Sequence, residues 1–260
     1  MAKKNNKAHT QPGRVSRDFG AVTGLIDSIW NEITSYQGHD WGLPENPKTL
    51  ENLIGPDETN KLYSMKDTIE QNVYLHTLLV NPLKDKDRGK RVKAIKWIVV
   101  EWGRINKGSA DLENWVDLLK DYDDKTIEDF VKSFKKERVA SWSKVLAFAD
   151  STKYAILDSR VALSLNIILE NVNYPHRFIM PPSRVEDVNE LFKLVKNNLD
   201  KKPKHKYLDY LDYLELLRAI EKNTSKNILD IEMRLFANTD RLASEYAKKH
   251  NIAYKEDKKS

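Results

Sequence analysis

One carboxylate in the sequence stands where an acid could take part in chemistry. Asp158 follows an apolar run, Tyr154-Ala155-Ile156-Leu157, and precedes Ser159-Arg160 and a stretch typical of a buried helix. A carboxylate at a helix N-terminus is kept ionised by the helix dipole and by free backbone N–H groups. Such a fixed negative charge can stabilise a developing cation or orient a water molecule. The same position also suits a purely structural N-cap, and the local sequence alone favours the cap.

The residues and motifs that several other kinds of catalysis require are absent from this sequence. It contains no cysteine, which excludes disulfides, zinc–thiolate sites, iron–sulfur clusters and a thiol nucleophile. No Gly-rich phosphate loop, HExxH motif, serine-hydrolase signature or kinase signature occurs. The six histidines are scattered without metal-ligand spacing: His9, His39, His76, His176, His205 and His250. The sequence therefore predicts neither a metal site nor an organic cofactor.

Length and composition allow a sizeable core. The chain has 260 residues, of which 40% are hydrophobic and 32% charged. That is enough for one large core or for two helical lobes that share a cleft. The net charge of +5 at pH 7 is a mild basic excess, which a solvated surface explains as well as an anionic partner does. No apolar run is long enough for a membrane span and the N-terminal stretch lacks the apolar core of a secretory signal, so we expect a cytoplasmic protein.

Three regions are predicted from the residue pattern. Residues 1–17 carry five basic side chains and no acid, and we expect a flexible basic arm that is either a disordered tail or an electrostatic tether. Residues 18–250 are predicted to form a helical domain with two lobes around a cleft, and residues 251–260 a polar tail. Apolar residues recur at three- and four-residue steps through the domain, without a strand or hairpin signal. We therefore predict an all-α fold of about ten helices.

Two of the predicted helices and one loop have clear boundaries. One apolar stripe covers residues 19–36, and another at residues 62–73 marks a single helix that stops near Asn81-Pro82. The stretch 39–58 contains three prolines and is predicted to be a loop.

Two basic stretches are candidate phosphate-contacting surfaces. Residues 84–96 contain seven basic and two acidic side chains, and residues 132–144 contain five basic and one acidic. Each could be a solvated face, but the second precedes Asp158 closely, which favours a binding role. The candidate DNA-contacting residues in the two stretches are Lys90, Arg91, Lys93, Lys135, Lys136, Arg138 and Lys144.

The segment from Val139 to Leu165 resembles the core of the helix-hairpin-helix DNA glycosylases, the superfamily that includes the 8-oxoguanine glycosylases. In that superfamily a hairpin leads into a helix, a short apolar stretch follows, and a catalytic Asp opens the next helix. The resemblance implies a hairpin at Lys135–Val139, its second helix at Ala140–Ala149, a turn at Asp150–Lys153, the apolar approach at Tyr154–Leu157 and Asp158 as the catalytic acid.

The chain departs from the superfamily pattern at two places. Its hairpin turn, Lys135 to Val139, has no glycine, so side chains would replace the usual backbone contact to phosphate, with or without a structural monovalent cation. The usual lysine nucleophile corresponds to Val139, and Lys144 lies out of register with it. We therefore expect a monofunctional enzyme that leaves an abasic site and has no lyase step.

The resemblance also implies a flipped-out base and a pocket that receives it. Our candidates for this pocket are Trp102, Arg104 and Trp142, although a core position for Trp142 is an equal alternative. Arg160 is expected either to contact phosphate or to pair with an acid.

The expected partner is double-stranded DNA that carries a modified base, bound by a monomer. The base would be an oxidised one or, given the Tyr- and Asp-rich stretch 207–213, a bulky modified base of phage DNA. Two alternatives stay open, namely a DNA-binding helical protein in which Asp158 is only a cap, and a protein-interaction domain.

Overall fold

The computed structural model describes residues 19, 24–34, 42–105, 112–121, 124–134, 138–181, 190–201 and 206–254. This part of the chain is built almost entirely of helices, and the all-α prediction is confirmed. The basic arm predicted at residues 1–17 lies outside the described residues. The hairpin lysines Lys135 and Lys136 and residues 255–260 of the tail also lie outside them.

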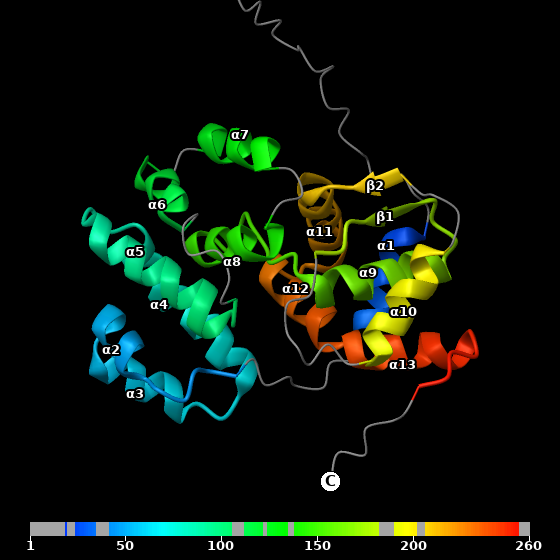
Figure 1. Ribbon diagram of the computed structural model, residues 1–260, viewed down its shortest axis with the longest axis horizontal. Helices are drawn as coiled ribbons and strands as arrows, with labels where there is room; N and C mark the ends of the chain where they lie inside the picture. The colour runs from blue at the N-terminus through cyan, green and yellow to red at the C-terminus, as the bar shows by residue number, and fades with distance from the viewer. Residues whose placement is uncertain are drawn as a thin grey trace, which may run out of the picture.

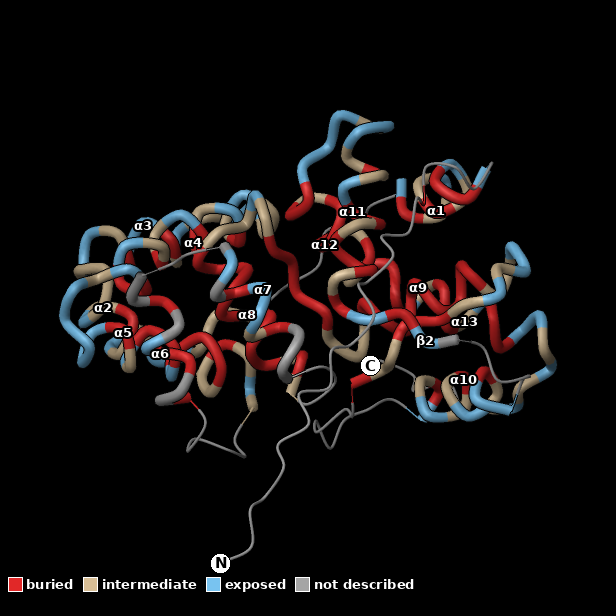
Figure 2. The backbone as a smooth tube through the Cα atoms, turned by 90° about the horizontal axis from the view of Figure 1, so that it is seen from above, coloured by how far each residue is buried: buried red, intermediate tan, exposed pale blue. Residues whose placement is uncertain are grey.

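The helices form two groups that lie side by side (Figures 1 and 2). The first group contains α2 (Lys48–Ile54), α3 (Pro56–Ser64), α4 (Thr68–Leu83), α5 (Arg88–Lys96), the π-helix η2 (Trp97–Trp102), α6 (Leu112–Asp121), α7 (Asp124–Phe134) and α8 (Val139–Ala149). The second contains α1 (Leu25–Thr34), α9 (Ser159–Asn171), α10 (Glu190–Asp200), α11 (Tyr210–Thr224), α12 (Ile228–Ala237) and α13 (Thr239–Lys249). The chain therefore starts in the second group, builds the first, and returns through the connection between α8 and α9.

Two of the boundary predictions are wrong. The stretch predicted to be a loop contains α2, which has seven residues and buries only Leu50, too few apolar positions to show a period. The helix predicted across residues 62–73 is two helices, α3 and α4. Asp67 separates them, because its carboxylate accepts hydrogen bonds from the backbone N–H groups of Ile69 and Glu70 and so caps a new helix.

A short parallel pair of strands was not predicted. β1 (His176–Phe178) pairs with β2 (Lys206–Leu208), and each strand has only three residues, too few for an alternating pattern. The side chain of Asn166 in α9 forms two hydrogen bonds with the backbone of β1. Its amide donates to the carbonyl oxygen of Phe178 at 2.9 Å and accepts from the Phe178 N–H at 2.8 Å.

The connection between the two groups runs through the core. Every residue of α8 except Ala140 is buried, as expected for a helix enclosed on all sides, and Tyr154–Leu157 continues as a buried extended stretch to α9 (Figure 2). Buried backbone outside regular structure needs other hydrogen-bond partners. Ser143 accepts from the N–H of Leu157 at 3.1 Å, and two tyrosines of α11 donate to carbonyl groups of the stretch.

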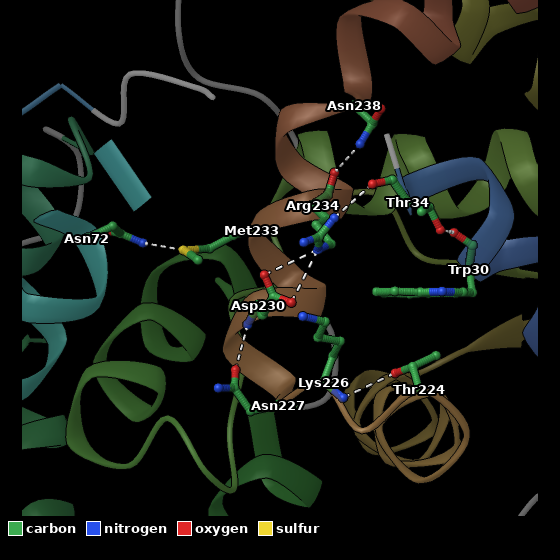
Figure 3. Close-up of polar contacts among 10 residues, drawn as sticks. All are labelled: Trp30, Thr34, Asn72, Thr224, Lys226, Asn227, Asp230, Met233, Arg234 and Asn238. Atoms are coloured by element: carbon green, nitrogen blue, oxygen red, sulfur yellow. Dashed lines mark hydrogen bonds and ion pairs between the residues drawn. The ribbon is translucent and has the colours of Figure 1, made fainter. Parts of the chain in front are cut away.

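Contacts on both sides hold α12 in place (Figure 3). Arg234 pairs with Asp230 on its own helix and donates to the carbonyl oxygen of Thr34, at the C-terminal end of α1, at 2.9 Å. On the other side, the amide of Asn72 in α4 donates to the sulfur of Met233 at 3.1 Å. The second of these contacts joins the two groups of helices.

The π-helix η2 ends at a crowded glycine. The N–H of Gly103 donates to the carbonyl oxygen of Ile98 at 2.9 Å, a bond that spans five residues and widens the turn. A Cβ atom on Gly103 would lie 2.8 Å from the carbonyl oxygens of both Ile98 and Val99, and 3.2 Å from Cδ of Lys144. Only glycine fits this close approach of backbone to backbone.

We predict that Gly103→Ala destabilises the protein by about 1–3 kcal/mol, because the added methyl group must push two backbone carbonyl groups apart. Denaturant unfolding monitored by circular dichroism measures the change. Gly89→Ala is the matched control, since its Cβ would meet only the side chain of Asp87, at 3.1 Å. A Gly103→Ala protein as stable as the wild type would contradict the packing described for η2.

Candidate active site

Asp158 is the N-cap of α9. Its Oδ1 accepts hydrogen bonds from the N–H groups of Arg160 at 3.0 Å and Val161 at 3.1 Å. This confirms the capping geometry that the sequence predicts. Because the cap uses only Oδ1, the second carboxylate oxygen is directed to another partner, and that partner distinguishes Asp158 from an ordinary cap.

The partner is Lys144 of α8. Its Nζ lies 3.4 Å from Oδ2 of Asp158, and the two side chains are only 8% and 15% exposed. This distance is longer than the roughly 2.7–2.9 Å of a strong charge-assisted hydrogen bond, so the two groups form an ion pair with a weak hydrogen bond. A buried ion pair loses about 3–5 kcal/mol when one partner is removed. The prediction that Lys144 contacts DNA phosphate from the surface is therefore corrected, because its ammonium group is buried against Asp158.

Trp102 and Gly103 also contact the side chain of Lys144. The lysine stem packs against the bare Cα of Gly103, and Nζ lies 5.6 Å from the centroid of the Trp102 ring. Trp102 in turn packs edge-on against Phe148 at a centroid distance of 5.0 Å. Trp102 is thus mostly buried and supports Lys144, which is a different position from the open stacking surface expected for a base pocket.

A third ionisable group, Glu232 of α12, was not found from the sequence. Its side chain is buried, and burial together with the negative charge of Asp158 raises its pKa to about 8, against an opposing effect of Lys144. Glu232 is therefore an uncharged acid at neutral pH. The available sequence signal was its place on the apolar stripe of α12, four residues after Ile228 and three before Leu235, where a charged side chain is unusual.

Two tyrosines of α11 line the approach to Asp158. The hydroxyl groups of Tyr210 and Tyr213 donate to the carbonyl oxygens of Ala155 and Ile156, each at 2.9 Å. Burial, the largest cause, raises the pKa of both phenols well above 10, so they remain donors. They fix the backbone that carries Asp158 and are not placed to receive a base.

His76 supports α8 and lies apart from the ion pair. Its ring stacks on Phe148 at a centroid distance of 3.8 Å, and Nδ1 lies 3.3 Å from the carbonyl oxygen of Ala147. Burial lowers the pKa of His76 to about 4, so the ring is neutral at physiological pH. Its role in this geometry is packing.

The remaining base-pocket candidates, Arg104 and Trp142, differ in their exposure. Arg104 is exposed, with a left-handed backbone φ of 51°, and its guanidinium lies beside Gly42. Trp142 is 1% exposed and packs edge-on against Tyr210 at 4.6 Å, which places it in the core, the alternative left open by the sequence.

Arg160 pairs with an acid, one of its two expected roles. It contacts Asp240 at 2.5 Å and lies over the rings of Phe192 and Phe236.

The basic candidates divide into buried and exposed side chains. Arg91 is buried and donates to the carbonyl oxygens of Asp85, Lys86 and Val116, so its prediction as a phosphate contact is corrected. Lys90 is exposed and pairs with Asp85 at 3.1 Å, and Lys93 is exposed on the same helix.

These basic residues do not surround Asp158. Helix α5 lies in the first group of helices, at the far end of the molecule from α9 (Figures 1 and 2). Arg138 is half-buried, with a left-handed φ of 55°, immediately before α8.

In the described part of the chain, no group of three or more His, Cys, Asp and Glu side chains is arranged to hold a metal ion. None of the described helices is both long enough and apolar enough to cross a membrane. The hairpin at Lys135–Val139, where the sequence leaves room for a monovalent cation, lies partly outside the described residues. No protein-family model, curated protein or solved structure matches the chain significantly.

The raised pKa of Glu232 predicts a pH-dependent stability. A carboxyl group with a folded-state pKa of about 8, above its usual 4.5, binds its proton more tightly in the folded state. The free energy of unfolding should therefore fall as the pH rises from 5 to 8, by up to about 1.4 kcal/mol per pH unit from this group. Glu232→Gln should remove this contribution.

Thermal or denaturant unfolding of both proteins across pH 5–8 measures the slope. Glu245→Gln, which removes an acid on the exposed side of α13, should leave the slope of the wild type in place. Parallel slopes for the wild type and Glu232→Gln would show that Glu232 is charged in the folded protein.

Proposed function

We propose that this protein is a DNA N-glycosylase that removes a modified base by hydrolysis and leaves an abasic site. The observation that carries the proposal is the buried Lys144–Asp158 pair, which places a fixed carboxylate at the start of α9 directly after the buried connection from α8. The segment resembles the helix-hairpin-helix glycosylases in its order of elements, which is a helix, a turn, an apolar stretch and then the acid. The pairing with Lys144 supports a role for Asp158 beyond capping.

The chemistry of base removal matches what Asp158 offers. When the bond between C1′ and the base nitrogen breaks, the sugar becomes a cation, and a preoriented carboxylate stabilises it. Oδ1 is held by two N–H groups while Oδ2 faces an ammonium at 3.4 Å, so the carboxylate is both oriented and matched to a positive charge. In the proposed reaction, the positively charged sugar lies beside the carboxylate of Asp158, as the ammonium group of Lys144 does in the structure. The electron pair of the broken bond leaves with the base, water adds to C1′, and the proton that this water releases neutralises the departing base.

The substrate is proposed to be duplex DNA with an oxidised base or a bulky modified phage base. Extrusion of such a base costs a few kcal/mol, less when the pair is already weakened. Tyr210 and Tyr213 do not support the bulky class, because both hydroxyl groups are committed to backbone carbonyl groups. Exposed basic residues of α5 are proposed backbone contacts, which would make binding strongly salt-dependent.

Asp158→Asn is the sharpest test, because asparagine is as good an N-cap as aspartate and α9 should stay capped. We expect base release to fall by about 100-fold or more, with DNA affinity changed only a few-fold. Duplexes with oxidised, alkylated or phage-type bases are incubated with each protein and abasic sites are quantified. Circular dichroism checks that the variant is folded, since Lys144 loses its charged partner.

The outcome separates the proposal from its alternatives. Base release by Asp158→Asn at the wild-type rate would refute the role of Asp158. DNA binding by the wild type without abasic product from any substrate would favour a non-catalytic DNA-binding protein. Absence of salt-sensitive DNA binding would favour a protein-interaction domain.

A second prediction concerns Lys144. An amine nucleophile must be free to reach C1′, whereas the side chain of Lys144 is buried and its Nζ lies 3.4 Å from Oδ2 of Asp158. We therefore expect that borohydride added during the reaction traps no covalent protein–DNA adduct. A trapped adduct that is lost in Lys144→Met and retained in Lys93→Met, an exposed lysine of α5, would instead assign an amine mechanism to Lys144.

A further inference from the structure

We propose that the exposed face of α5 is a docking surface for the sugar–phosphate backbone of duplex DNA, separate from the site at Asp158 and independent of base sequence. This basic face consists of Lys86, Lys90, Lys93 and Lys96, all of which are exposed. The choice of duplex DNA as the partner rests on the proposed glycosylase function.

Three of these lysines follow one another along the outer side of α5. Lys90, Lys93 and Lys96 are exposed, whereas Ala94 and Ile95 on the opposite side of the helix are buried. Each residue of an α-helix turns by about 100°, so Lys90 and Lys96 lie about 60° to either side of Lys93. The helix itself contains no acidic residue, so its outer side carries charge of one sign.

A buried arginine holds the turn that precedes α5. Arg91 is 3% exposed and donates to the carbonyl oxygens of Asp85 at 2.6 Å and Lys86 at 3.1 Å. It also donates to the carbonyl oxygen of Val116 in α6 at 3.3 Å. The backbone that carries Lys86 is therefore fixed relative to α5 and α6. A surface whose backbone is fixed beforehand loses less conformational entropy when it binds a partner.

An acidic neighbour neutralises only part of the basic face. Nζ of Lys90 lies 3.1 Å from Oδ2 of Asp85, so this lysine is already paired. Among the described residues, Lys86, Lys93 and Lys96 form no ion pair. Three ammonium groups are thus available to an anionic partner.

The length and charge of the basic face match a stretch of duplex DNA. Between Lys90 and Lys96 the axis of α5 rises by about 9 Å, at about 1.5 Å per residue. A duplex carries one negative charge per roughly 1.7 Å of its axis, so this length faces about five phosphate groups. Ammonium groups bind phosphate as point charges, and contacts to phosphate carry no sequence information. The basic face therefore fits the part of DNA that is the same in every sequence.

An anionic membrane matches this surface less well. A helix that lies in a membrane surface presents large apolar side chains beside its basic ones. The exposed large apolar side chains of the described residues are Val73, Val172 and Tyr207, and none of them belongs to α5. The apolar side chains Ala94 and Ile95 of α5 are buried in the core. The surface thus offers charge without an apolar group that could enter a lipid layer.

The basic face lies apart from the proposed catalytic residue. Helix α5 is in the first group of helices, at the far end of the molecule from α9, whose N-cap is Asp158 (Figures 1 and 2). Contacts at α5 therefore do not depend on whether a base is modified. In this arrangement α5 holds the protein on unmodified DNA, and the modified base is recognised elsewhere on the molecule.

Binding of an unmodified duplex at a series of salt concentrations tests the basic face. Fluorescence anisotropy of a labelled duplex compares the wild type with the double variant Lys93→Gln/Lys96→Gln. We expect the affinity to fall by roughly 10-fold or more, because two phosphate contacts are lost. The slope of log Kobs against log salt concentration should become shallower by about 2. A duplex with a modified base should show the same loss.

The double variant Lys222→Gln/Lys226→Gln is the matched control. It removes two exposed lysines from the second group of helices, at the end of α11 and just beyond it, and should keep the wild-type slope. Circular dichroism checks that both double variants are folded. An unchanged slope in Lys93→Gln/Lys96→Gln, or an equal loss in the control, would overturn the assignment to α5.

Three further outcomes separate this proposal from the glycosylase function. Binding of the wild type to phosphatidylserine vesicles but not to DNA would overturn the choice of partner. Salt-dependent DNA binding that needs Lys93 and Lys96, without base release from any duplex, would support the basic face and refute the glycosylase function. Base release with DNA binding that does not need these lysines would do the reverse.

Discussion

At the junction between the two groups of helices, a buried ammonium group faces a buried carboxylate. Lys144 and Asp158 come from helices in different groups, and each is costly to bury without the other. The pair can persist only if α8, the extended connection and α9 hold fixed positions. The packing of Lys144 against Gly103 and Trp102 meets part of this requirement, and the cap hydrogen bonds of Asp158 meet the rest.

The extended stretch before Asp158 imposes a second requirement, which helices of the second group satisfy. Tyr154–Leu157 is buried without being helical, so its carbonyl groups must find donors within the protein. Tyr210 and Tyr213 provide them, and their high pKa values keep them protonated. Aromatic residues that could be mistaken for a base-binding surface thus serve the backbone that positions the acid.

Glu232 is a buried acid in addition to the Lys144–Asp158 pair. A simple bridge needs two opposite charges, and Lys144 with Asp158 already supplies them. Glu232 adds a second acid that burial holds in its neutral form. The exposed basic face of α5 lies at the other end of the molecule from α9 (Figure 1), so a DNA duplex that reached both would have to extend across the first group of helices.

The helical class and the cap at Asp158 could be predicted from the sequence, because both depend on residues close together in the chain. The sequence also indicated where α8 and α9 lie, which made the resemblance to glycosylases visible. The meeting of Lys144 with Asp158, and the burial of Glu232, Arg91 and Trp142, depend on how segments distant in the chain pack together. Periodicity gives the buried face of each helix but not its neighbours, and a protonation state depends on those neighbours.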